Sequence, residues 1–186
     1  MNALVVLRWL EERPSSIALR ESIWAYPIVE STHVWSLALF VGFAVLLDLR
    51  LVGAAMRSVP ASEVARRLFP WMIAGFAIMV VTGLLLFYAI PVRTYQSVFF
   101  RLKLILLALA AINVFVFHSG IWRRVADWDR DSRPPRAARV AGAFSLLLWV
   151  GVIFCGRMIA YNWFDCDRQP QPAIVNWAAG CVVEPG

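Results

Sequence analysis

The chain has 186 residues, of which 61% are hydrophobic and 16% charged, and its mean hydropathy is +0.68. Soluble domains carry about a quarter charged residues, so the composition excludes an ordinary soluble domain and indicates a lipid environment. The formal net charge is +6, and Lys103 is the one lysine among 18 basic residues. Because the arginines flank apolar segments, we expect them to meet phospholipid headgroups and expect no nucleic-acid partner.

The N-terminal segment, residues 1–26, precedes the first long apolar run. Its first ten residues are mostly apolar but too few for a membrane span, and Glu11, Glu12 and Arg13 follow them without a small-residue cleavage pattern. We therefore expect no cleavable signal peptide. Residues 2–12 are predicted to form a short amphipathic helix on the membrane surface, with a flexible terminus as the alternative.

Four apolar stretches follow, and each is long enough to cross a bilayer, which takes about 20 residues. They predict helices because backbone groups in lipid must satisfy their own hydrogen bonds. The predicted spans are 27–54, 68–90, 98–121 and 138–163, and an extended tail covers 164–186. The expected fold is an all-α, membrane-embedded four-helix bundle whose transmembrane domain covers 27–163.

The placement of arginines predicts the orientation of the spans. The connections 57–67 and 119–139 contain nine arginines, whereas residues 93–103 on the other side contain three basic residues. Positive charge in short loops marks the cytoplasmic side of a membrane. We expect a multi-pass protein of a bacterial inner membrane, with both termini in the periplasm.

The cysteines agree with this orientation. Cys166 and Cys181 lie in the proline-containing tail, on the side where disulfides form. The pair predicts a disulfide that staples the tail, with two free thiols as the alternative. Cys155 lies within the fourth span and is expected to be a small packing residue.

Polar side chains within the spans are costly in lipid and are therefore candidate functional residues. Glu30, His33 and Asp48 share one face of the first span, since the 18 residues from Glu30 to Asp48 make five helical turns. We expect that face to turn toward the other helices, and Arg50 to extend to the inner interface. The remaining polar candidates lie in the third and fourth spans: Lys103, Asn113, His118, Arg157 and Tyr161.

The second span has no such charged residue in its apolar part. Met72, Gly75, Met79 and Thr82 fall on one stripe of it. We interpret this stripe as a surface for helix packing, and a methionine ligand for a metal as the lesser alternative.

The two histidines, His33 and His118, indicate haem b, which the helices of a bundle can ligate. His33 lies early and His118 lies late in two spans that run in the same direction. Their depths in the membrane therefore differ by about 15–25 Å. One haem shared between them within a protomer is therefore not expected. His33 could pair with Met158, with haem propionates meeting Arg157 or Arg101.

His118 has its own alternatives. It could pair with Met72, or a symmetric dimer could supply a second histidine. Without a cofactor, His33 would bond Glu30 or a polar group of the fourth span. His118 would then extend to the headgroups beside Arg123 and Arg124.

No motif in the sequence fixes a reaction. It contains no phosphate-binding loop, no spaced His/Cys metal cluster and no serine in an elbow context, so we do not expect an enzyme by itself. The leading hypothesis is a small redox protein that holds haem b or exchanges electrons with quinone. The alternatives are a non-catalytic accessory or assembly subunit of a larger membrane complex and a small-solute or ion-conducting oligomer.

A set of short motifs carries a family resemblance. It comprises Arg20-Glu21-Ser22, Tyr26-Pro27, Glu30 with His33, Asp48 to Gly53, Phe69-Pro70-Trp71, Gly75-Phe76, Thr82-Gly83, Phe100 to Leu104, and Asn113 to His118. Over residues 15–120 this set resembles an uncharacterised family of bacterial membrane proteins, catalogued as a domain of unknown function. The resemblance implies a four-helix inner-membrane protein and no activity, and it leaves out the last span and the tail. Its matching polar positions are Glu30, His33, Asp48, Arg50, Arg101, Lys103, Asn113 and His118.

Overall fold

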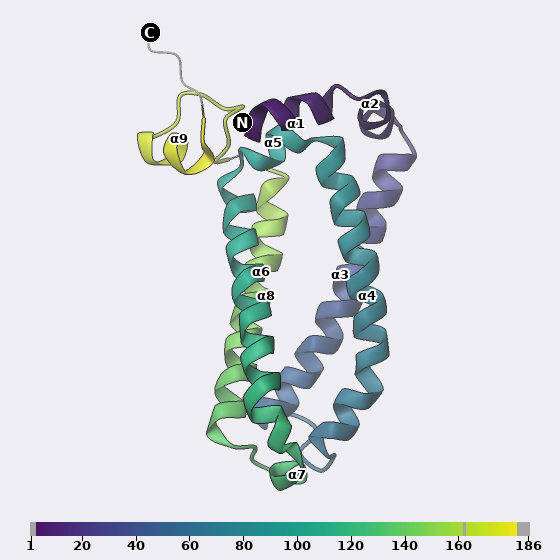
Figure 1. Cartoon of the computed structure of the whole chain (residues 1–186), viewed down its shortest axis with the longest axis vertical. Helices are drawn as coiled ribbons and strands as arrows, with labels where there is room; N and C mark the ends of the chain where they lie inside the picture. Colours follow the sequence, from purple (N-terminus) through teal and green to yellow (C-terminus); the bar gives the residue numbers. More distant parts are fainter. Residues whose placement is uncertain (1–2, 162, 182–186) are drawn as a thin grey trace. The chain divides into compact units, whose positions relative to one another are not determined.

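The structure is a computed structural model that describes residues 3–161 and 163–181 (Figure 1). Within these residues it contains helices and no strand, as predicted. The helices in chain order are α1 (Ala3–Glu11), α2 (Pro14–Glu21), α3 (Ala25–Val52), α4 (Ala61–Ala89), α5 (Pro91–Tyr95), α6 (Val98–Val116), α7 (Val125–Trp128), α8 (Arg136–Ile159) and α9 (Ala173–Ala179). A π turn (Phe117–Ile121) and a 3₁₀ turn (Trp122–Arg124) carry the chain from α6 to α7.

Four stretches of helix are long and apolar enough to cross a membrane, namely Ala25–Val52, Ala61–Ala89, Val98–Trp128 and Arg136–Ile159. The protein is therefore a multi-pass membrane protein in a lipid bilayer. Several apolar side chains of α3 are exposed, as a surface in contact with lipid requires. Trp35 is 78% exposed, and Leu39 and Leu46 also lie on the surface.

The second span begins seven residues earlier than predicted. Glu63, in the first turn of α4, pairs with Arg66 and Arg67, each at 2.5 Å, so the charged residues form a helical turn outside the apolar run. Asp129 caps this helix from another connection, because its carboxylate accepts from the Ser62 backbone N–H at 2.7 Å and from the Ser62 hydroxyl at 2.6 Å. Such contacts between distant segments extend α4 beyond its hydrophobic part.

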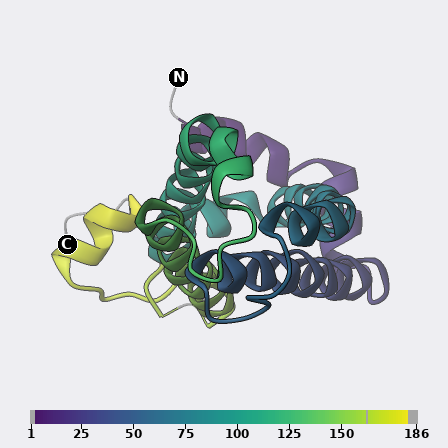
Figure 2. The ribbon, with the colours of Figure 1, turned by 90° about the horizontal axis from the view of Figure 1, so that it is seen from below.

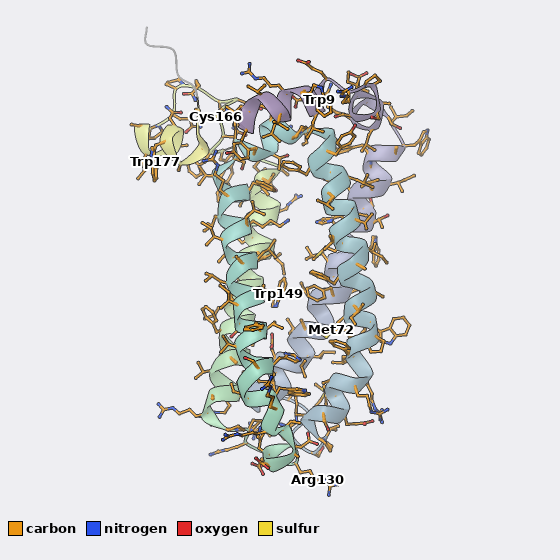
Figure 3. The ribbon with its side chains drawn as sticks, viewed as in Figure 1. Trp9, Met72, Arg130, Trp149, Cys166 and Trp177 are labelled. Carbon is orange, nitrogen blue, oxygen red and sulfur yellow. A yellow bond between two sulfur atoms is a disulfide. The ribbon has the colours of Figure 1, made fainter. Side chains whose placement is uncertain are left out.

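The chain divides into two compact units. The first unit comprises residues 1–33, 80–105 and 153–186, and the second comprises residues 34–79 and 106–152. In the second unit, Val41, Ala110, Leu148, Trp149 and Val152 form one buried cluster. Phe40 of α3 packs edge-on against Trp149 of α8, with ring centroids 5.0 Å apart. Trp149 is labelled in Figure 3.

Small residues bring helices of the second unit together. A Cβ on Gly75 of α4 would lie 3.1 Å from the Phe40 nitrogen and 3.2 Å from the Ser36 carbonyl oxygen of α3. A Cβ on Gly142 of α8 would lie 3.0 Å from the Asp48 carbonyl oxygen. The structure thus gives the Gly75 stripe the helix-packing role expected of it.

Arg50 does not extend to the interface as the sequence suggested. It is fully buried beneath the connections that follow α3 and α7, which lie next to each other in Figure 2. Its Nε donates to the Val59 carbonyl oxygen at 2.7 Å, and its Nη2 donates to the carbonyl oxygens of Asp129 and Asp131 at 3.1 Å each. The prediction was wrong because it treated the end of α3 as free, whereas the two connections fold over it and supply carbonyl acceptors.

In the first unit, short helices lie across the ends of the long ones (Figure 1). The helix predicted at residues 2–12 is present as α1, which packs against α5, and α2 is a second short helix that was not predicted. Ser16 of α2 is buried and donates to the Tyr88 carbonyl oxygen of α4 at 2.8 Å. This bond satisfies a carbonyl at the C-terminal end of α4.

The tail is more ordered than the extended segment that was predicted. Cys166 and Cys181 form a disulfide, and the helix α9 lies between them. Pro172 precedes the first turn of α9, and Gly180 ends it with φ +71°, a left-handed conformation that suits glycine at a helix C-terminus. Prolines indicated a loop here, but a proline just before a helix is compatible with it.

Candidate functional site

The strongest candidate site is built around His33, on α3 in the first unit. The side chain is half-buried, and its Nδ1 lies 3.0 Å from Thr82 Oγ1 of α4. In the tautomer with the proton on Nδ1, His33 donates to the Thr82 hydroxyl oxygen and Nε2 is the basic nitrogen. The contact therefore fixes the orientation of the imidazole within the membrane.

The glycine next to Thr82 provides the space for this ring. A Cβ on Gly83 would lie 3.1 Å from His33 Cε1 and 3.6 Å from Nδ1. A larger residue would push the ring from its place, so Thr82 and Gly83 act together, one as hydrogen-bond partner and one as a recess. The sequence showed this Thr-Gly pair, but helical periodicity within one span cannot reveal which residue of another span it meets.

A second group in the same unit involves α6 and α8. The Lys103 amino group lies 3.7 Å from the position of a Cβ on Gly156 and interacts electrostatically with the buried thiol of Cys155. Met158 is also buried in α8, at 8% exposure. The first unit therefore contains an imidazole, an amine and a thioether on membrane-spanning helices.

The arginines expected to meet haem propionates are engaged elsewhere in the unit. Arg101 Nη1 donates to the Ala178 carbonyl oxygen at 2.8 Å, and Nε donates to the Tyr95 carbonyl oxygen at 3.2 Å. Arg101 therefore anchors the disulfide-closed tail. Arg157 is exposed and donates from Nη2 to the Tyr161 hydroxyl oxygen at 3.0 Å, one turn further along the chain.

The other predicted ligand pair lies in the second unit. His118 is exposed in the π turn, and its Nδ1 lies 3.2 Å from the Val114 carbonyl oxygen, the acceptor one helical turn before it. Its ring also packs near Phe117 and Trp122. Met72 of α4 is half-buried in this unit. No described contact joins Met72 to His118, and the His118 side chain is exposed.

Asp48 is the most buried acidic residue among the spans of the second unit. Its side chain is 7% exposed and accepts a hydrogen bond from Ser145 of α8, and its Oδ2 has no partner in the described part of the chain. Such a carboxyl can hold or release a proton inside the bilayer. Asn113 of α6 donates to the Ala141 carbonyl oxygen at 3.1 Å, which is a helix-packing contact.

The three polar residues of the first span do not share one environment. Glu30 is exposed near the start of α3, His33 is half-buried in the first unit, and Asp48 is buried in the second. The helical period correctly aligned them but did not show how far each lies from the helix ends. The expectation that the whole polar face turns inward was therefore wrong for Glu30.

No group of three or more His, Cys, Asp or Glu side chains that could hold a metal ion occurs within residues 3–161 and 163–181. Residues 21–162 match the family model of DUF6644, a family of unknown function. This match includes the fourth span, which the motifs noted above did not cover. No curated protein and no solved structure matches the chain.

Proposed function

The chain belongs to DUF6644, a family of unknown function, and from the setting of His33 we propose that it is a small membrane redox protein that binds haem b. The observation that carries this proposal is the contact of His33 Nδ1 with Thr82 Oγ1. Histidines that ligate metals characteristically use the second ring nitrogen in a hydrogen bond, which fixes the ring and its tautomer. His33 has that arrangement on a membrane-spanning helix.

The first unit contains side chains of the types that bind a haem iron and a haem propionate. His33 would bind the haem iron through Nε2, and the buried Met158 would be the soft ligand available on α8. Lys103 replaces Arg101 as the candidate partner for a propionate, because Arg101 already holds the tail. When bound, haem b supplies a one-electron couple, and the apolar spans around it exclude water.

We further propose that the protein exchanges electrons with a partner within the membrane, such as a quinone. The chain has no second cofactor motif of its own, so it would act as one component of an electron-transfer chain. The proposed location is a bacterial inner membrane with both termini in the periplasm. The nine arginines of the two connections on one side support this orientation, and so does a disulfide on the other.

The deciding experiment is the visible spectrum of the full chain, purified in detergent from haem-replete cells. We expect reducible b-type bands with about one haem per chain. His33→Ala should abolish them, and Thr82→Val should weaken haem affinity about 10–100-fold, as second-shell changes at metal sites do. His118→Ala is the matched control, because His118 is exposed and lies in the second unit.

A colourless preparation that is monodisperse and helical would overturn the haem proposal. Equal loss of haem in His33→Ala and His118→Ala would overturn the assignment of the haem to His33 and not to His118. Stable co-purification of a colourless chain with a larger membrane complex would instead favour an accessory subunit. Ion flux through liposomes that contain the colourless chain would favour a conducting oligomer.

A further inference from the structure

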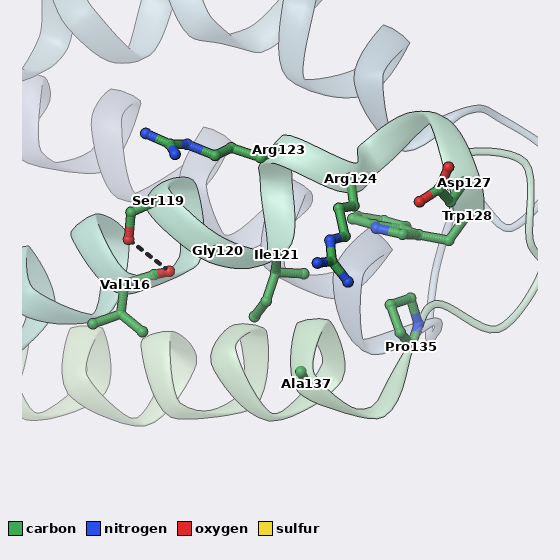
Figure 4. A pocket seen from close by; sticks show the side chains of 10 residues that line it. All are labelled: Val116, Ser119, Gly120, Ile121, Arg123, Arg124, Asp127, Trp128, Pro135 and Ala137. Carbon is green, nitrogen blue, oxygen red and sulfur yellow. Dashed lines mark hydrogen bonds between the residues drawn. The ribbon is translucent and has the colours of Figure 1, made fainter.

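A hollow lies at the end of α6 in the second unit, with a volume of about 700 Å³. It is bounded by the turns that follow α6 and by the start of α8, and its lining includes Ser119, Gly120, Arg123, Arg124 and Pro135 (Figure 4). The hollow does not involve His33 or any other residue of the first unit. It is therefore independent of the proposed haem site.

Irregular backbone creates this hollow. The regular turns of α6 end at Val116, and the π turn and the 3₁₀ turn that follow change the rotation per residue before α7 begins. Gly120 lies in the wide π turn, and a Cβ there would meet nothing within 4 Å. The absence of a side chain at this position keeps the hollow open.

The charge in the hollow is positive and is not neutralised by the protein. Arg123 and Arg124 are exposed, and neither makes an ion pair with a carboxylate of residues 3–161 or 163–181. In Figure 4 the Arg124 side chain extends between Ile121 and Pro135, while the Asp127 carboxylate points away beyond Trp128. Arg123 extends the other way, toward the Ser119 end of the turn, so one guanidinium lies in the hollow and a second lies at its edge. With the Asp127 carboxylate directed away, the hollow has a net positive charge, which suits a phosphate.

An apolar strip leads to the hollow along α6. Ile112 and Val116 are 58% and 57% exposed, and they precede Gly120 at intervals of four residues, so the three positions lie on one face of the helix. Since Val98–Trp128 is a membrane-spanning segment, this strip faces the acyl chains of lipid. A ligand that places a phosphate in the hollow and hydrocarbon on the strip matches both surfaces.

We propose that this hollow is a binding site for the phosphate headgroup of an anionic phospholipid. Arg124 would donate to the phosphate from within the hollow and Arg123 from its edge, and the acyl chains would lie along Ile112 and Val116. The strip distinguishes a phospholipid from a free phosphate, which would gain nothing from it. The positive charge distinguishes an anionic lipid from a zwitterionic one.

The test is lipid binding to the full chain in detergent, followed by native mass spectrometry. Dioleoyl phosphatidylglycerol, dioleoyl phosphatidylcholine and inorganic phosphate are titrated separately. We expect phosphatidylglycerol to bind more tightly than phosphatidylcholine. Its affinity should fall about fivefold for Arg124→Ala and about 25-fold for the Arg123→Ala/Arg124→Ala double variant, since each arginine contributes about a factor of five near an anionic surface.

Matched variants separate the site from general attraction. Gly120→Leu should weaken binding by filling the hollow, whereas Gly42→Leu should not, because a Cβ on Gly42 of α3 also meets open space. Arg130→Ala removes an exposed charge that does not line the hollow, and it should change the affinity less than twofold. All variants are first checked for monodispersity and helix content.

Three results would overturn the proposal. The first is equal affinity for phosphatidylglycerol and phosphatidylcholine. The second is unchanged phosphatidylglycerol binding in a folded double variant or a folded Gly120→Leu variant. The third is displacement of phosphatidylglycerol by inorganic phosphate at a concentration equal to that of the lipid. That result would assign the hollow to a soluble anion.

Discussion

The carboxylate of Asp129, in the connection after α7, accepts from both the backbone N–H and the hydroxyl of Ser62, at 2.7 Å and 2.6 Å. Ser62 is the second residue of α4, so Asp129 stabilises the N-terminus of a helix that is distant in sequence. The main-chain carbonyl oxygen of the same residue accepts from Arg50. Asp129 thus links α3, α4 and the connection between α7 and α8 through both its side chain and its backbone.

Asp129→Ala should lower the free energy of unfolding by about 1–2 kcal/mol, which is the usual loss when a helix cap is removed. The backbone bond to Arg50 stays intact in this variant. Thermal unfolding in detergent measures the effect. Asp127→Ala serves as the control because Asp127 is exposed, and a loss of equal size in both variants would contradict the capping role.

Arg50→Met should be more damaging, because it leaves the carbonyl oxygens of Val59, Asp129 and Asp131 without their buried donor. We expect a loss of about 3 kcal/mol or more in the free energy of unfolding. Arg50→Lys should recover only part of it, since an ammonium cannot reproduce the planar guanidinium geometry. If Arg50→Met unfolds at the same temperature as the wild type, the three bonds contribute nothing to stability.

Gly75→Leu should destabilise the second unit, because the new Cβ would lie 3.1 Å from the Phe40 nitrogen and 3.2 Å from the Ser36 carbonyl oxygen. Overpacking at such a contact costs about 1–3 kcal/mol. Gly42→Leu is the same change in open space and should be neutral. Denaturation by a harsh detergent compares the two variants, and an equal response would show that the α3–α4 contact is not tight.

Removing the disulfide with the Cys166→Ser/Cys181→Ser pair should loosen the tail. The bond closes a loop with a sequence separation of 15, and loops of this length are stabilised by about 3 kcal/mol in the chain-entropy account. Hydrogen exchange of the α9 amides should accelerate accordingly, while Cys155→Ala leaves it unchanged. Unaltered exchange would mean that Arg101 and its carbonyl contacts hold the tail without the disulfide.

The stability of the tail should depend on pH through Asp165. Burial raises the pKa of this carboxyl, the carboxylate of Asp167 raises it further, and backbone hydrogen bonds from Asp167 and Arg168 and the charge of Arg93 oppose the rise. A folded-state pKa above the unfolded value means that the folded state binds the proton more tightly. The resulting stabilisation is present at pH below the unfolded pKa and is lost as pH rises through the folded pKa.

Asp165→Asn should remove this dependence, because an amide does not titrate. Hydrogen exchange of the amides between Asp165 and Cys181, measured across the acidic range, compares the two proteins. Exchange in the wild type should quicken as pH rises, after correction for the intrinsic pH dependence of amide exchange. A variant that keeps the wild-type profile would place the titrating group elsewhere.

The sequence was sufficient to predict what depends on apolar length. The four spans and the cysteine pair of the tail were visible as composition or spacing. The sequence did not predict the contacts between segments that are distant along the chain. Arg50 looked like an interfacial arginine because its acceptors belong to connections that are distant in sequence.

The candidate site shows the same division. His33 stood out because an imidazole is rare within a span, whereas Thr82 and Gly83 became its neighbours only through the register of α3 against α4. The role of Ser145 beside Asp48 was missed for the same reason. The hollow near Arg124 depends on a π turn, and no residue pattern in FHSGI distinguishes such a turn from continued α-helix.

The third crossing, from Val98 to Trp128, contains 31 residues. The regular helix α6 within it has 19 residues, about 28 Å at about 1.5 Å per residue, which is close to the hydrocarbon thickness of about 30 Å. Arg123 and Arg124 follow the π turn that comes after α6, so a bilayer several Å thicker would still leave both guanidinium groups outside the hydrocarbon layer.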